Sequence, residues 1–245
     1  MFSPNGKLLA SRGRSMVNIW DLATSSILRT FYDPFSMLKF SPESKLLSSV
    51  QEKLEIRLSD PVTDTISWSF ICSLRPVHKA IFSRDGRILV LSGGAGEVKL
   101  LHPSTGVSLY SIVCSTNFIL MELSPDGHLL ALGEGDEFIK IYRLTFNSLP
   151  HLIDSVNISH YAINLQASPC NSLAFSPNSK ELAMGGVDWL RLYDPFDGLM
   201  SPLHRGIVGP VRSVEFSSDG KLLAWVEDFV RLRYVMADKT RHSHT

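Results

Sequence analysis

One short phrase recurs six times along the 245 residues, and it constrains the fold more than any other feature of the chain. Its first copy reads Phe-Ser-Pro-Asn-Gly-Lys-Leu-Leu-Ala, and the intervals between successive copies are 38, 42, 41, 52 and 41 residues. A nearly fixed period of this length indicates that each copy belongs to one repeated supersecondary unit. The copies begin at Phe2, Phe40, Phe82, Leu123, Phe175 and Phe216.

The phrase itself predicts a hairpin. An apolar stretch ends at its first residue and a second apolar stretch follows four or five residues later. In between, proline presets φ, asparagine or aspartate tolerates the next turn position, and glycine closes the turn. The second stretch, such as the Ile-Leu-Val of 88–90, is rich in strand formers and too short for a helix.

A second landmark follows each phrase and predicts a third strand. In the first repeat it is the Val-Asn-Ile-Trp-Asp of 17–21, where apolar and polar residues alternate. A polar turn and a weaker fourth strand, such as 108–113, come next. Four antiparallel strands per period of about 41 residues predict an all-β fold made of β-propeller blades. The equivalent third strands begin at Ile56, Val98, Ile139, Leu190 and Val230.

The chain resembles the WD-repeat family through the six turns together with Trp20-Asp21, Ser59-Asp60 and Tyr193-Asp194. The stretches 60–63 and 102–106 are similar to the repeat arrays of fungal NACHT-type signalling NTPases. The resemblance implies a WD-repeat-type β-propeller that serves as a protein–protein interaction scaffold, as part of a longer array in a signalling protein. Since a single copy keeps Trp-Asp and the Gly-His pair of the family is missing, we expect the blades to depend mainly on apolar packing.

We expect the propeller to span 1–236, followed by a polar tail at 237–245. Because one residue precedes the first phrase, and few follow the last strand, the first and last of the six four-stranded blades are predicted to be incomplete. We therefore expect either a piece of a longer array or a ring that does not seal, with an exposed strand edge. The blades are expected at 1–33, 34–73, 74–115, 116–158, 170–205 and 206–236, with an insertion at 159–169.

Composition excludes several classes of protein. The 24 Lys and Arg balance the 24 Asp and Glu, which argues against a nucleic-acid partner bound through a basic surface. No apolar run approaches the length of a membrane span, and no secretory signal is visible, so we expect a cytoplasmic protein without membrane contact. Cys72 and Cys114 lie one period apart and are expected to be free, buried thiols.

Catalytic motifs are missing from the sequence. The glycine-rich segment 92–97 lacks the Lys-Ser/Thr of a phosphate-binding loop, and no nucleophile elbow is present. Neither an acid–base pair nor a metal-binding set of residues converges in the pattern of repeats. We therefore expect no enzyme activity, no cofactor and no metal. Two other hypotheses stay open: a propeller that gates a separate catalytic domain, and a decayed fragment without function.

The turns between second and third strands are the predicted partner-binding face. Basic residues lie at its N-terminal end and acidic residues at its C-terminal end, which would steer an oppositely charged segment. Trp189, at a turn tip, would anchor a contact. The alternative is that the charges only solvate the turns and that the Trp189 ring folds onto its blade. The candidates are Arg12, Arg14, Glu52, Glu97, Glu134, Asp136, Glu137, Asp188, Trp189, Glu227 and Asp228.

Overall fold

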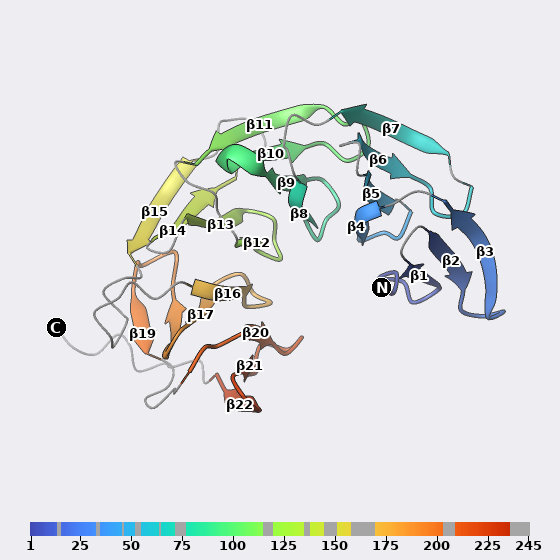
Figure 1. Ribbon diagram of the computed structural model, residues 1–245. Coiled ribbons are helices and arrows are strands. Elements are labelled where there is room, and N and C mark those ends of the chain that lie inside the picture. Colours follow the sequence, from blue (N-terminus) through green and yellow to red (C-terminus); the bar gives the residue numbers. More distant parts are fainter. Residues whose placement is uncertain are drawn as a thin grey trace. The chain divides into compact units, whose positions relative to one another are not determined.

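A computed structural model gives the structure of the chain (Figure 1). It describes residues 1–13, 16–32, 35–45, 47–51, 55–63, 65–71, 77–114, 120–134, 138–144, 151–157, 170–202 and 209–235. Across these residues the regular structure is strands, apart from a single 3-10 turn at Gly94–Gly96. The all-β prediction is therefore confirmed. The predicted insertion 159–169 and tail 237–245 lie outside the described residues.

The strands form six antiparallel sheets in which sequence neighbours pair in chain order. The first three sheets are β1 (Leu8–Arg12), β2 (Val17–Asp21) and β3 (Ser26–Phe31); β4 (Phe35–Phe40), β5 (Leu47–Gln51), β6 (Glu55–Ser59) and β7 (Ile66–Ile71); and β8 (Val77–Phe82), β9 (Leu89–Gly93), β10 (Glu97–Leu101) and β11 (Ser108–Val113). The last three are β12 (Met121–Leu123), β13 (Leu129–Glu134), β14 (Phe138–Arg143) and β15 (His151–Asn157); β16 (Cys170–Phe175), β17 (Leu182–Gly186), β18 (Trp189–Tyr193) and β19 (Met200–Pro202); and β20 (Ser213–Phe216), β21 (Leu222–Val226) and β22 (Val230–Tyr234).

Four of the sheets have four strands, and the first and last have three among the described residues. The six sheets match the six predicted repeats, and the incomplete first and last blades stay a prediction. By its internal contacts the chain divides into two compact units, Met1–Phe118 and Ile119–Thr245, each with three sheets. The blade boundaries of the sequence analysis, and a single propeller domain over 1–236, remain predictions.

A serine side chain organises each of the five recurring turns that lie wholly within the described residues. In the fourth turn, Ser124 Oγ donates to Asp126 Oδ1 at 2.6 Å and accepts the Leu129 N–H at 2.8 Å. Asp126 Oδ1 also accepts the His128 N–H at 3.0 Å. Because the serine is buried, these bonds replace the water that its hydroxyl loses. The same bonds are made by Ser3, Ser83, Ser176 and Ser217.

The turn proline is less important than the sequence suggested. Arg84 and Ser218 occupy its position in the third and sixth turns, yet the serine network there is intact. Two hydrogen bonds to each Asx carboxyl or amide oxygen, one from a hydroxyl and one from the backbone, fix the same geometry without the ring of proline. In these two turns the Ser-x-Asx pair therefore fixes the turn without proline.

Two turns carry serine where the others carry glycine. Ser44 and Ser179 have φ values of 63° and 61°, in the left-handed region that disfavours side chains. Each hydroxyl accepts a backbone N–H from the turn of the preceding sheet: Asn5 N to Ser44 Oγ at 3.0 Å, and Asp126 N to Ser179 Oγ at 3.1 Å. The bond between turns offsets the backbone strain.

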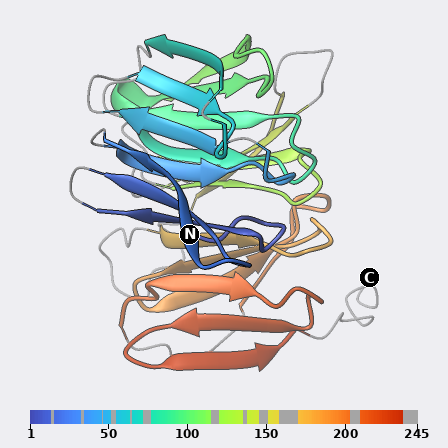
Figure 2. The same cartoon turned by 90° about the vertical axis from the view of Figure 1, so that its right-hand side faces the viewer.

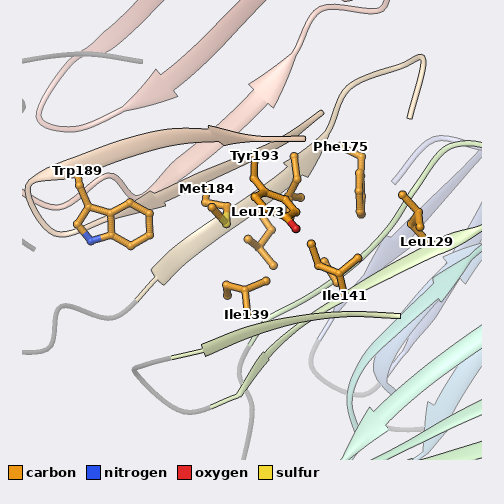
Figure 3. Close-up of a cluster of buried hydrophobic side chains, with 10 residues drawn as sticks. Leu129, Ile139, Ile141, Leu173, Phe175, Met184, Trp189 and Tyr193 are labelled. Carbon is orange, nitrogen blue, oxygen red and sulfur yellow. The ribbon is translucent and has the colours of Figure 1, made fainter. Parts of the chain in front are cut away.

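Neighbouring sheets within a unit pack through the third strand of one and the inner strands of the next. Figure 3 shows this for Ile139 and Ile141 of β14, which pack against Leu173, Phe175 and Met184 of the following sheet. The equivalent apolar pairs of β2, β6 and β18 are buried in the same way against the sheet that follows each of them. Apolar packing between successive sheets is thus the repeated unit of the core.

Removing one turn hydroxyl tests the serine network. Ser124→Ala leaves the Leu129 N–H without an acceptor in a buried site, so we expect a loss of about 1–3 kcal/mol in the free energy of unfolding. Urea denaturation followed by far-ultraviolet circular dichroism measures it. The control is Ser218→Ala, an exposed serine in the sixth turn, which should change stability by less than about 0.5 kcal/mol. Equal effects of the two substitutions would contradict the assignment.

The serine at positive φ gives a second prediction. Ser179→Ala keeps the strained backbone and loses the bond to Asp126 N–H, whereas Ser179→Gly loses the bond but relieves the strain. Glycine should therefore be the better tolerated replacement, by about 1–2 kcal/mol in unfolding free energy. Parallel urea titrations of both variants decide it, and an alanine variant as stable as the glycine variant would show that the turn is unstrained.

Candidate interaction site

The structure describes part of the predicted partner-binding face. Glu134 is the last residue of β13, but the structure gives no account of its side chain. Arg12 and Asp228 are exposed, and their contact with a partner stays a prediction. Four candidates lie outside the described residues: Arg14, Glu52, Asp136 and Glu137.

Two further candidates are already engaged within their own unit. Glu97 accepts the Ser111 hydroxyl at 2.9 Å, and its carboxylate lies 3.5 Å from Lys99 Nζ. Asp188 has φ 65°, and its carboxylate accepts the Gly209 N–H at 2.6 Å. Asp188 therefore fixes the connection to the sixth sheet, and the charge of Glu97 is partly compensated by Lys99.

Trp189 is not an exposed anchor, so that prediction is wrong and its alternative is right. The residue is 2% exposed, and its ring lies at one end of the buried cluster beside Met184 (Figure 3). Gly186 lies directly opposite Trp189 in the β17–β18 pairing, and a Cβ on that glycine would collide with the indole ring. Because Gly186 has no side chain, there is space for the Trp189 ring. The buried Nε1 of Trp189 has no hydrogen-bond partner.

Glu227 is likewise part of the structure rather than a charge that faces a partner. It is 7% exposed and accepts the Trp225 indole N–H at 2.8 Å, while Arg231 Nε lies 3.6 Å from its other carboxylate oxygen. A buried indole donor needs an acceptor, and a buried carboxylate needs a compensating charge. Both needs are met within one sheet.

A groove at the other ends of the strands was missed by sequence reasoning. It lies between the first and second sheets, has a volume of about 860 Å³, and is formed where their turns meet. Two of these turns are the recurring serine turns, and the other two follow the third strands. The lining residues are Asn5, Gly6, Lys7, Leu8, Asp21, Leu22, Ala23, Leu28, Ser44, Lys45, Asp60, Pro61 and Val62.

The two carboxylates of the groove are held by their own turns. Asp21 Oδ1 accepts the N–H groups of Ala23 and Thr24, at 2.7 and 3.2 Å. Asp60 Oδ1 accepts those of Val62 and Thr63, both at 2.8 Å. Partial burial raises the pKa of Asp60, but the bonds from Thr63 and Val62 outweigh it and hold the pKa below its ordinary value. Both carboxylates therefore shape the groove as caps of their own turns.

The cations of the groove, in contrast, are free. Lys7 and Lys45 are exposed, and within the described part of the chain neither ammonium group has a hydrogen bond or an ion pair. Leu28 and Val62, which are 40% and 44% exposed, supply apolar wall. Arg29 Nε donates to the Val62 carbonyl at 3.1 Å, which ties the two sheets together beside the groove. The groove thus combines apolar surface with two unpaired positive charges.

No metal-binding arrangement is found. Among the described residues, no group of three or more His, Cys, Asp or Glu side chains is placed to hold a metal ion. Cys114 is buried, Cys170 is partly exposed, and Cys72 lies outside the described residues. Over the same residues, no helix has the length and apolar character that crossing a membrane requires.

Comparisons with known proteins agree with the sheet architecture. No family model matches the chain. It is 20% identical over 220 residues to COMPASS component SWD3 of Saccharomyces cerevisiae, across 84% of this chain and 69% of that protein. It is 28% identical over 149 residues to a serine-threonine kinase receptor-associated protein of Gallus gallus, across 60% of this chain. The chain spans about two fifths, 39%, of the length of that second relative.

Solved structures are similar over nearly the whole chain. A chain of the mitotic checkpoint complex crystal structure superposes with a TM-score of 0.72 at 18% identity, covering 96% of this chain and 73% of that one. The Cps50 (Swd1) β-propeller domain of Myceliophteria thermophila gives 0.55 at 16% identity, covering 95% and 94%. With the six repeated sheets, these likenesses assign the chain a WD-repeat-type β-propeller fold.

The thiol of Cys170 gives a pH-dependent prediction. Burial raises the pKa of Cys170 to about 12, and backbone hydrogen bonds with Ser172 and Gly185 lower it by less. The thiol should therefore stay protonated and react slowly with iodoacetamide at pH 8 until the protein is unfolded. Because the unfolded thiol ionises near pH 9.0 and the native one does not, this group should also reduce stability as pH rises from 9 towards 12.

Site-resolved peptide mapping by mass spectrometry, with and without urea, measures the labelling. Alkylation of Cys170 in the native protein as fast as in urea would contradict the assignment. Because mapping assigns each labelled peptide to one position, reaction at the other two cysteines does not affect the reading.

Proposed function

We propose that this protein is a non-catalytic, WD-repeat-type interaction scaffold whose groove between the first two sheets binds a peptide segment of a partner protein. The groove with its two unpaired ammonium groups carries the proposal. The names of the similar proteins support it, because one is a component of COMPASS, one is a receptor-associated protein, and one belongs to the mitotic checkpoint complex. We also propose that the chain is part of a longer repeat array in a signalling protein. We place it in the cytoplasm and expect it to bind neither nucleic acid nor a membrane.

The chemistry of the groove selects the kind of peptide. An aliphatic or aromatic side chain fits against Leu28 and Val62, where covering apolar surface gains about 25 cal/mol per Å². A neighbouring aspartate or glutamate would reach Lys7 and Lys45. The carboxylates of Asp21 and Asp60 already accept backbone N–H groups. These hydrogen bonds reduce the attraction of the two carboxylates for a positively charged ligand. The ligand class is an acidic peptide with an apolar anchor.

A peptide-display library selected on the purified chain tests the proposal. We expect enrichment of sequences in which an apolar residue lies beside Asp or Glu. Synthetic peptides of that sequence should bind the Lys7→Glu, Lys45→Glu double variant at least ten times more weakly, since two attractive charges become repulsive. Binding should also weaken as salt rises.

Lys180→Glu is the matched control. Lys180 has the same place in the fifth recurring phrase and is exposed, but it is not part of the groove. This variant should bind the selected peptides as the parent chain does. Selection of basic peptides, or equal weakening by both sets of variants, would overturn the proposal.

A further inference from the structure

We propose that Asn5 and Gly6 form a self-modification site, at which Asn5 deamidates to aspartate or isoaspartate and the new carboxylate weakens peptide binding in the groove. The second part rests on the proposed function. Asn5 is an exposed lining residue of the groove, in the turn before β1. Figures 1 and 2 show the start of the first sheet beside the N-terminus. Of all asparagines in the sequence, Asn5 is the one that glycine follows.

The reaction consumes only water. The Gly6 nitrogen attacks Cγ of Asn5, the bond between Cγ and Nδ2 breaks, and ammonia leaves with the proton of the Gly6 N–H. Water then opens the succinimide ring that has formed. Opening at Cγ gives aspartate, and opening at the main-chain carbonyl of Asn5 gives isoaspartate. Glycine favours ring formation because it has no Cβ to hinder the attack.

The turn polarises the amide that reacts. Oδ1 of Asn5 accepts the Ser3 hydroxyl at 2.8 Å and the Lys7 N–H at 3.0 Å. Both donors face the oxygen on which negative charge develops during the attack, so they stabilise the transition state as an oxyanion hole does. The Gly6 N–H donates to the Ser3 carbonyl at 2.9 Å, and this bond must break before the nitrogen attacks.

The other recurring turns indicate what an aspartate product does. Aspartate already occupies the equivalent place in the third, fourth and sixth turns, where it accepts the same two bonds. In the third turn, Arg87 Nε lies 3.7 Å from Asp85 Oδ2. In the sixth turn, Lys221 Nζ lies 3.8 Å from Asp219 Oδ2. The aspartate therefore fits the turn and pairs with the cation two residues later.

Asparagine, in contrast, leaves that cation free. Lys7 follows Asn5 by two residues and Lys180 follows Asn178, and within the described part of the chain neither ammonium group has an ion pair. Deamidation of Asn5 converts the first turn to the aspartate type. The new carboxylate then compensates the charge of Lys7, one of the two cations of the groove, and repels an acidic peptide.

The sixth turn also indicates that the product is ionised. The Ser217 hydroxyl and the Lys221 N–H donate to the Asp219 carboxylate, and with the Lys221 ammonium group they hold the pKa of Asp219 below its ordinary value. The first turn offers an aspartate the same kinds of donor and the same cation. The carboxylate formed there should therefore be negatively charged at neutral pH.

Peptide mapping by mass spectrometry, on the folded chain kept in mildly alkaline buffer, follows the reaction. Asn5 should deamidate about ten times faster than Asn178, which accepts the same two bonds but precedes Ser179. Gly6→Ser should slow the reaction at Asn5 by a similar factor. Serine has this place at positive φ in two other turns, and a Cβ on Gly6 meets no described atom within 4 Å, so the variant should fold. Equal rates at the two asparagines, or in variant and parent, would overturn the modification site.

Asn5→Asp tests the effect on the groove. The acidic peptides selected on the parent chain should bind this variant about fivefold more weakly, because one cation is compensated. Asn178→Asp makes the same change in a turn outside the groove and should bind them as the parent does. Equal binding by Asn5→Asp and the parent would overturn the regulation and leave the proposed function standing. A parent chain that selects no acidic peptide would overturn the proposed function and the regulation together, whereas the mapping decides the modification by itself.

Discussion

A sheet of this protein cannot bury its own apolar face, and the rest of the structure follows from that constraint. The two apolar residues of β2, β6, β14 and β18 point out of their sheets and are buried where the inner strands of the next sheet in the same unit cover them. Burying an Ile, Leu or Val side chain contributes about 1.5–3 kcal/mol. Each internal contact between sheets is therefore worth several kcal/mol, while β22, without such cover, keeps its apolar residues exposed.

The turns add a second, polar layer to this packing. The serine and Asx pair satisfies the backbone within a turn, and Ser44 and Ser179 extend the bonding to the turn of the preceding sheet. The first of these bonds lies beside the groove, because Asn5 and Ser44 are both lining residues. The same contact that aligns two sheets thus shapes the surface that we propose binds a peptide.

The repeat made most of the fold predictable from the sequence, because its period, its turn residues and its alternation all agree. The fate of single side chains was less predictable. Trp189 folds inward because Gly186 leaves space opposite it, and Glu227 is buried because Trp225 needs an acceptor. Both depend on cross-strand partners that no local pattern shows. The groove was missed for the same reason, since its walls come from turns of two repeats, although free Lys7 and Lys45 occupy equivalent places in the phrase.

Leu58 and Leu232 occupy the same place in the second and sixth repeats, and comparing them tests most directly whether cover by the next sheet stabilises the fold. Leu58 is fully buried and Leu232 is 67% exposed. Equilibrium urea unfolding of the two alanine variants should show a loss of about 2–5 kcal/mol for Leu58→Ala and less than about 0.5 kcal/mol for Leu232→Ala. Equal losses at the two positions would contradict the account.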